Sequence, residues 1–310
     1  DPESEIVVTC GSTEAMMATM LSITNPKDKV VIFSPFYENY GADTILSGAE
    51  PIYVPLVPPD FTFSIEQLEN AFKQGAKALI LCNPSNPCGK VFTFEELTAI
   101  ADVVKKYDAY VVTDEVYEHI VYAPNKHIYM QALDGMRERT IVCNSLSKTY
   151  SITGWRLGYV IANPEIIDRV KKVHDFLTVG AAAPLMEAAT VGLKFDDKYY
   201  DELAAHYAHM KEVFVGGLEK LGLKYTDPQG AYYVLVDVSE FGVKDDVKFC
   251  EWLAQYVGVA AVPGSSFFRE DVNNLIRFHF AKQDDTLNEA INRLAGLRKA
   301  VAEAGDVEWR

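Results

Sequence analysis

The sequence predicts an α/β fold, with a large domain built on a mostly parallel sheet flanked by helices and a smaller α/β domain at the carboxyl end. Short apolar runs such as residues 30–33 and 78–82 alternate with longer segments of helical periodicity. Beyond residue 195 a long helical segment leads into a second group of strands and helices. The 310 residues, 49% of them hydrophobic, are enough for one large core and one smaller core. We therefore expect a large domain over residues 1–195 and a small domain over residues 196–310.

Strands are expected where Val, Ile and aromatic residues form short runs between turn residues, at 6–9, 30–33, 51–56, 78–82, 109–113, 140–143 and 157–162. Helices are expected over residues 14–21, 93–107, 165–177 and 198–221, with another that begins at Ser64. Ser64 and Thr93 each stand three residues before Gln or Glu, which is the spacing of a capping box. In the second region we expect strands at 232–237, 259–262 and 275–280 and a helix at 247–256.

Charge and composition exclude several classes of protein. A formal net charge of −15 without a basic stripe argues against nucleic acid as a partner. No apolar run reaches the ~20 residues that span a bilayer, and the first residues do not resemble a signal peptide, so we expect a cytoplasmic protein without a membrane partner. The five cysteines include no Cys-x-x-Cys pair and the six histidines show no ligand spacing, so neither a disulfide framework nor a metal site is expected.

A glycine and two hydroxyl residues, Gly11, Ser12 and Thr13, follow the first strand and precede the first helix. We expect residues 10–13 to form a turn whose free N–H groups and hydroxyls can bind an anion, helped by the helix dipole. Taken alone, the same residues are also explained as a helix cap.

Two later strands also end in polar residues. Residues 83–89 read Asn-Pro-Ser-Asn-Pro-Cys-Gly, a stiff turn that can hold the Asn86 amide in one orientation, because proline restricts itself and its predecessor. Asp114 follows the strand at 109–113, where a buried carboxylate needs a partner such as a protonated ring nitrogen. Taken alone, Asp114 could instead cap a helix. Tyr37, beyond the strand at 30–33, could stack on a planar cofactor or belong to the core.

Lys148 is the strongest candidate for a catalytic side chain. It follows the strand at 140–143, lies among Ser145, Ser147 and other hydroxyl residues, and precedes Arg156 by eight positions. Partial burial and a nearby cation lower the pKa of a lysine and free its amine for imine chemistry, while the serines and the arginine can hold a phosphate. The alternative is a surface lysine in a Ser/Thr-rich loop.

These motifs together resemble those of the class I/II aminotransferases, the fold-type-I pyridoxal-phosphate enzymes, in the family's order over residues 9 to about 280. The resemblance implies that Lys148 forms the Schiff base with pyridoxal 5'-phosphate. It also implies cofactor contacts for the following residues: Ser12, Thr13, Ser145, Ser147 and Arg156 at the phosphate, Tyr37 on the ring face, Asp114 at the ring nitrogen, and Tyr117 and Asn86 at the phenolic oxygen. Arg277, with Asn86, would hold the substrate α-carboxylate. Cys88 departs from the family's usual threonine, which puts one local hydrogen bond in doubt.

The resemblance implies ping-pong transfer of an amino group from an L-amino acid to a 2-oxo acid, in a homodimer. One alternative is a carbon–sulfur lyase, a β-eliminating enzyme of the same fold. Another is the aminotransferase-like domain of a transcription regulator. The side-chain specificity is left open by the sequence.

Family members normally carry a substantial segment before the phosphate-binding turn, which here begins near Ile6. In the family that segment packs on the small domain and reaches the partner subunit. We therefore expect this chain to be a truncated form of a longer homodimeric enzyme, with poor substrate binding and exposed apolar surface.

Overall fold

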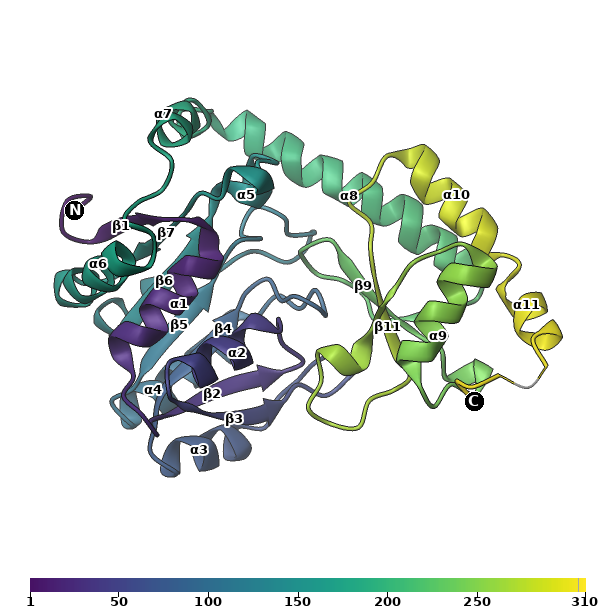
Figure 1. The fold of residues 1–310 in the computed structure, drawn as a ribbon, viewed down its shortest axis with the longest axis horizontal. Helices are drawn as coiled ribbons and strands as arrows, with labels where there is room; N and C mark the ends of the chain where they lie inside the picture. Colours follow the sequence, from purple (N-terminus) through teal and green to yellow (C-terminus); the bar gives the residue numbers. More distant parts are fainter. Residues whose placement is uncertain (306) are drawn as a thin grey trace.

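The computed structural model describes residues 1–305 and 307–310. Its first layer is a seven-stranded sheet in which five neighbouring strands run parallel, the sixth runs antiparallel to them, and the seventh, at the edge, pairs antiparallel with the sixth (Figure 1). In spatial order the strands are β1 (Ile6–Thr9), β7 (Gly158–Ile161), β6 (Thr140–Ser145), β5 (Tyr110–Asp114), β4 (Ala76–Cys82), β2 (Lys29–Ser34) and β3 (Glu50–Pro55). The expected α/β class with a mostly parallel sheet is confirmed.

Helices cover both faces of this sheet, which explains why its central strands are continuous apolar runs. Val30 and Ile32 of β2 pack in one core cluster with α1 (Gly11–Ile23), α2 (Asn39–Leu46) and α6 (Pro164–Thr178). Val31 and Phe33 face the opposite way and pack with α3 (Ile65–Lys73) and α4 (Phe94–Lys106). Alternate residues of one strand thus belong to two cores, as a pleated strand requires.

A second, four-stranded antiparallel sheet occupies the carboxyl-terminal region, in the order β10 (Val262–Pro263), β11 (Leu275–His279), β9 (Tyr233–Asp237) and β8 (Lys224–Tyr225). Its core cluster includes residues of four helices, α8 (Asp197–Lys220), α9 (Asp246–Trp252), α10 (Asp284–Leu294) and α11 (Leu297–Glu303). The long helix α8 follows α7 (Ala183–Gly192) and runs from the first sheet region to the second (Figure 1). In the part of the chain described, no helix is both long and apolar enough to cross a membrane.

Both expected helix starts are present, and their capping differs. Thr93 and Glu96 form a complete capping box at the start of α4. Ser64 accepts the N–H of Gln67 at the start of α3. The sequence therefore located both helix starts through local hydrogen bonds that do not depend on the rest of the fold.

Three local expectations were wrong. Residues 10–13 are not a separate turn, because α1 already begins at Gly11, and the buried Glu14 carboxylate accepts the N–H of Cys10 at 2.5 Å to close the first turn. Residues 259–261 are not a strand: only Val262 and Pro263 pair with β11, and Val259 and Ala260 line a hollow beside it instead. The helix expected at 247–256 ends as α9 at Trp252 and continues as a π-helix, Leu253–Val257.

Candidate active site

A cavity of about 180 Å³ opens where β4, β5 and β6 end, at the carboxyl edge of the parallel strands. Ligands of open α/β sheets bind at this edge. Ten of the residues singled out in the sequence line this cavity: Ser12, Thr13, Tyr37, Asn86, Asp114, Tyr117, Ser145, Ser147, Lys148 and Arg156. Arg277 lines an adjoining pocket of about 380 Å³ that shares Ser147, Lys148, Thr153 and Tyr233 with the first.

One end of the cavity is built to receive an anion. Ser12 and Thr13 stand in the first turn of α1, where N–H groups are free and the helix dipole is positive. Ser147 donates its N–H to the Ser145 hydroxyl oxygen at 3.0 Å, and the two hydroxyls are 2.7 Å apart. Arg156 adds a guanidinium whose Nη1 donates to the Thr153 carbonyl at 3.0 Å. These donors suit a phosphate group.

Gly11 makes the close approach of Arg156 possible. Its φ is +83°, and a Cβ added there would lie 2.4 Å from Nη2 of Arg156. Gly158 allows the backbone of β7 to approach that of α1, since a Cβ at Gly158 would lie 2.4 Å from the Gly11 carbonyl carbon. Both positions therefore need glycine, so that helix α1, strand β7 and the guanidinium can meet around one small space.

The second feature of the cavity is a buried carboxylate. Asp114, at the end of β5, is 7% exposed, and its Oδ2 accepts the Tyr40 hydroxyl at 2.7 Å. Its Oδ1 accepts the Val116 N–H at 3.3 Å, and no helix begins at this position, so Asp114 is not a helix cap. Burial raises the pKa of Asp114, whereas the hydrogen bonds from Tyr40 and Val116 and the charge of Lys148 oppose that rise.

Lys148 stands between these features. Strand β6 continues to Ser145, so the lysine lies in a four-residue helix, α5 (Leu146–Thr149), rather than at the strand end itself. Its Nζ is 5.8 Å from the centre of the Tyr232 ring and its side chain borders both pockets. The Lys148 amine can therefore contact a molecule bound in either pocket.

Arg277, on β11, reaches the same place from the second sheet. Its guanidinium carbon lies 4.4 Å from the Tyr233 ring centre and 4.3 Å from that of Phe267, so the two rings hold it. Nη1 donates to Oδ1 of Asn86 at 2.6 Å. Burial lowers the pKa of Arg277, yet an arginine stays protonated in proteins. The remaining donors of its planar fork suit a carboxylate.

Several aromatic side chains of the site carried no individual signal in the sequence. Tyr40, Tyr207, Tyr232 and Tyr233 lie at the two pockets, and the Tyr233 hydroxyl is 3.0 Å from that of Tyr117. Tyr40 follows Tyr37 by three residues, a spacing that places both on one side of a helical turn. From this spacing the sequence could have predicted that Tyr40 lies near Tyr37 at the site.

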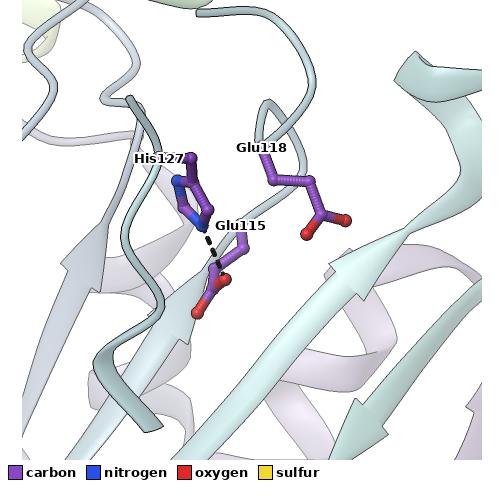
Figure 2. Close-up of side chains that lie close together, drawn as sticks. All are labelled: Glu115, Glu118 and His127. Carbon is purple, nitrogen blue, oxygen red and sulfur yellow. Dashed lines mark hydrogen bonds and ion pairs between the residues drawn. The ribbon is translucent and has the colours of Figure 1, made fainter. Parts of the chain in front are cut away.

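The structure also gathers three residues of metal-ligating types, two glutamates and a histidine, whose proximity is not evident from sequence spacing. Glu115, Glu118 and His127 offer atoms within 4.8 Å of one another (Figure 2). Each carboxylate already accepts hydrogen bonds: Glu115 from Thr113 at 2.7 Å and across 2.9 Å from His127, and Glu118 from Asn144 at 2.7 Å. These bonds give the cluster a structural explanation as a partly buried polar network.

The donor set fits pyridoxal 5'-phosphate, the cofactor expected from the sequence. A phosphate matches the hydroxyls and guanidinium at the α1 end, and the glycine-lined approach there leaves no room for larger side chains. A protonated ring nitrogen would satisfy the buried Asp114 carboxylate, and Lys148 offers its amine nearby.

Comparison with known proteins agrees with this fit. The family model described as aminotransferase class I and II matches residues 1–294. A probable N-succinyldiaminopimelate aminotransferase of Mycobacterium tuberculosis is 36% identical, over 97% of this chain and 79% of its own length. The methionine aminotransferase of Escherichia coli is 34% identical, over 96% of this chain and 77% of its own length.

Among solved structures, N-succinyldiaminopimelate aminotransferase from Mycobacterium tuberculosis superposes with a TM-score of 0.92 at 37% identity, covering 96% of this chain and 78% of that one. Sequence and structure therefore lead to the same family. The chain belongs to the class I and II aminotransferases, enzymes that use pyridoxal 5'-phosphate to transfer amino groups.

Proposed function

We propose that Lys148 is the catalytic residue of this aminotransferase and that the cavity around it holds the cofactor. The observation that carries the proposal is the position of its amine: it borders the cavity that contains both the anion-binding end and the buried Asp114, and also the pocket that contains Arg277. Few enzyme reactions need an amine, an anion-binding site, a buried carboxylate and an arginine in one place. Transfer of an amino group between an amino acid and a 2-oxo acid is one that does.

When bound, pyridoxal 5'-phosphate supplies an aldehyde carbon that takes up the amino group and a ring that delocalises the charge left when the α-proton departs. The Lys148 amine would hold the cofactor through its carbonyl carbon and would serve as the base that carries the α-proton of the substrate. Ser12, Thr13, Ser145, Ser147 and Arg156 hold the phosphate. Tyr37, which lines the same cavity, would stack on the ring.

Asp114 would keep the ring nitrogen protonated, because a buried carboxylate is satisfied by an N–H partner. Tyr117 and Asn86 supply hydrogen-bond donors at the phenolic oxygen. Asn86 also contacts Arg277, since its Oδ1 accepts from the guanidinium at 2.6 Å, which leaves its amide N–H groups for the cofactor. Arg277 binds the α-carboxylate that every donor and acceptor carries.

A donor screen tests the proposed reaction. The protein loaded with pyridoxal 5'-phosphate should convert 2-oxoglutarate to glutamate in the presence of a suitable L-amino acid, and a parallel reaction without acceptor should release neither pyruvate nor ammonia. Pyruvate and ammonia without an acceptor would instead identify a β-eliminating lyase.

We further propose that the preferred donors carry an aromatic or other uncharged side chain. The pocket beyond Lys148 is walled by Tyr207, Tyr232 and Tyr233, with His279 and Ala281 at its border. Burial and the cations Lys282 and Arg277 lower the pKa of His279, so it is neutral at pH 7. Among the described residues that line this pocket, the cations are Lys148 and Arg277. Both are assigned above to the amino group and the α-carboxylate, so neither is left to pair with an acidic side chain of the donor.

The relative from Escherichia coli is named for methionine, an uncharged donor. Phenylalanine or methionine should therefore give a kcat/KM at least ~10-fold above that of aspartate, a difference that buried polar mismatches readily produce. Tyr207→Ala should reduce the phenylalanine value more than the alanine value. A preference for aspartate would show that a cation from outside this chain completes the pocket.

We also propose a homodimer, with residues 1–195 as the large domain and residues 196–310 as the small one. Apolar side chains stand exposed on and just after α6 and α7, with Phe176 91%, Val179 80% and Val191 61% exposed. This surface adjoins the phosphate end of the cavity, since Gly180 contacts Cys10 next to Gly11. A second copy of the chain would cover it.

Light scattering after size-exclusion chromatography tests the dimer. Phe176→Asp should yield monomer where the parent chain gives dimer, whereas the same change at Phe94, which is 55% exposed on α4, should leave the dimer intact. Monomer for the unaltered chain at micromolar concentration would overturn the proposal.

We propose the cytoplasm as the compartment. The cysteines are all free thiols, with Cys88, Cys143 and Cys250 buried, and free thiols persist in reducing compartments. Fractionation of cells that express the protein from its own gene tests this location.

A further inference from the structure

Tyr40 has no role in the scheme above, yet it makes the shortest contact to Asp114. Its side chain is 3% exposed, and its hydroxyl donates to Oδ2 of Asp114 at 2.7 Å. The two residues belong to different elements, α2 and β5, and lie 74 positions apart in the sequence. The contact is therefore a product of the tertiary fold.

The surroundings hold the Tyr40 hydroxyl in one place. The backbone N–H of Tyr40 donates to the Tyr37 carbonyl at 3.0 Å, and the backbone carbonyl of Tyr40 accepts the Thr44 hydroxyl at 2.8 Å. The rings of Tyr37 and Tyr40 meet edge to face with centres 5.7 Å apart. The main chain of Tyr40 is thus held by hydrogen bonds and its buried ring packs against Tyr37, so both favour the position of the hydroxyl beside the carboxylate.

The charges around Asp114 show why this donor matters. Burial raises the pKa of Asp114 and so favours its neutral form, and the negative charge of Glu115 acts in the same direction. The hydrogen bond from Tyr40 is the largest effect that lowers this pKa, followed by the Val116 N–H and the charge of Lys148. The thiols that face Asp114, Cys82 on β4 and Cys143 on β6, have pKa values raised by burial and remain neutral.

Tyr40 itself stays protonated. Burial and the charge of Asp114 hold the pKa of Tyr40 well above its usual range, so Tyr40 is a neutral donor at pH 7. Glu115 is held by hydrogen bonds to other partners: its Oε1 accepts the Thr113 hydroxyl at 2.7 Å. Its Oε2 lies 2.9 Å from Nε2 of His127 (Figure 2).

We propose that Tyr40 is a positioning residue that keeps Asp114 ionised and leaves its other oxygen directed at the ring nitrogen of the cofactor. The inference rests on the proposed role of Asp114. In this arrangement one carboxylate oxygen is occupied by the tyrosine hydroxyl, and Oδ1, which accepts only the longer 3.3 Å bond from Val116, is left for the ring N–H.

Binding of two cofactors to the full chain tests this role without reliance on turnover. Pyridoxal 5'-phosphate has the ring nitrogen, and its 1-deaza analogue has carbon there, so the ratio of their dissociation constants measures the interaction between Asp114 and the nitrogen. In Tyr40→Phe the preference for the natural cofactor should fall by about 10-fold, the range of a hydrogen bond to a charged group. Tyr122→Phe, which removes another buried hydroxyl that donates to the Ala231 carbonyl, should leave the ratio unchanged.

The pH dependence supplies a second readout. Loss of the Tyr40 donor lets Asp114 protonate at a higher pH, so the acid limb of cofactor binding should move upward by about one pH unit. A histidine at this position carries a ring N–H that can donate to Asp114. Tyr40→His should therefore recover part of the cofactor preference that Tyr40→Phe loses, a recovery that a folding defect would not give.

The outcomes separate the two proposals. If Asp114→Asn loses the preference but Tyr40→Phe keeps it, Tyr40 is a core residue and the inference is wrong, while the role of Asp114 stands. If Asp114→Asn keeps the preference, the proposed role of Asp114 is wrong and the inference fails with it. If both lose it and the double variant loses no more than Asp114→Asn alone, Tyr40 acts through Asp114.

Discussion

The Arg277 guanidinium donates to Oδ1 of Asn86 at 2.6 Å, although 191 positions separate the two residues. Asn86 belongs to the stiff turn after β4 and lines the first pocket, and Arg277 belongs to the second sheet and lines the adjoining one, so this bond joins the two sheet regions. Any molecule that engages both residues contacts both regions at once.

This relationship predicts the behaviour of Arg277→Lys. A lysine keeps the charge but loses the planar fork, so it cannot hold the α-carboxylate and Asn86 together. We expect KM to rise about 10-fold or more for both amino donor and 2-oxo acid, with a smaller change in kcat. Steady-state kinetics in both directions measures this, and Arg293→Lys on the exposed face of α10 is the control. An increase confined to one substrate would place Arg277 at the side-chain end of the pocket.

Lys148→Ala should abolish turnover, because the amine is proposed both to attach the cofactor and to carry the proton. The variant should lack the visible absorbance of cofactor bound to lysine, and added small primary amines should restore part of the rate. Lys126→Ala, at an exposed position, is the matched control. Substantial transamination by the Lys148 variant without added amine would refute the assignment.

Asp114→Asn should lower kcat by about 100-fold or more, since electrostatic contributions of this kind are typically about 3 kcal/mol. The amide has nearly the same shape as the carboxylate, so the expected defect is in charge and not in packing. Asp246→Asn removes another buried aspartate, one that accepts from Ser265 at 2.7 Å outside the site, and should affect stability without this loss of rate. A rate equal to that of the parent enzyme would leave Asp114 without a chemical role.

Gly11→Ala should weaken phosphate binding. The added Cβ would lie 2.4 Å from the Arg156 guanidinium, and the φ of +83° is strained for alanine, so the arginine or the start of α1 must move. We expect the affinity for pyridoxal 5'-phosphate to fall by about 10-fold or more, with inorganic phosphate a weaker competitor than for the parent chain. Gly154→Ala, with nothing within 4 Å of its added Cβ, is the control. Equal affinities would mean that Arg156 does not contact the phosphate.

Asp43→Asn should raise stability, and more so at pH 8 than at pH 6. Asp43 is 5% exposed, its Oδ2 has no hydrogen-bond partner, and burial raises its pKa to about 7. The folded state therefore holds its proton up to about pH 7, whereas an unfolded aspartate with a pKa near ~4 has lost it, so stability falls as pH rises between these values. An asparagine removes this dependence.

We expect the Asp43 variant to melt a few degrees higher at pH 8. Calorimetry at the two pH values measures the difference, and Asp175→Asn, at an exposed site, should show none. A variant that is equally or less stable at pH 8 would show that the Asp43 carboxylate has a partner.

The sequence by itself determined the α/β class, most strand and helix positions, and the residues that meet at the cavity. These features depend on local signals: the alternation of apolar runs with helical periodicity, the capping box at Thr93, and polar motifs directly after strands. Because the parallel strands end at the same edge, motifs far apart in the chain could be expected to share one site.

The tertiary structure alone decided the contacts that join distant elements. The bond from Tyr40 to Asp114, the rings that hold Arg277, and the network of Glu115 with His127 all depend on which helix or strand lies beside which. The antiparallel order of the second sheet and the short length of β10 also depend on which strands pair in space. Side-chain hydrogen bonds and ring contacts of this kind leave no periodic trace in a sequence, because they depend on a spatial separation of a few ångströms and not on residue spacing.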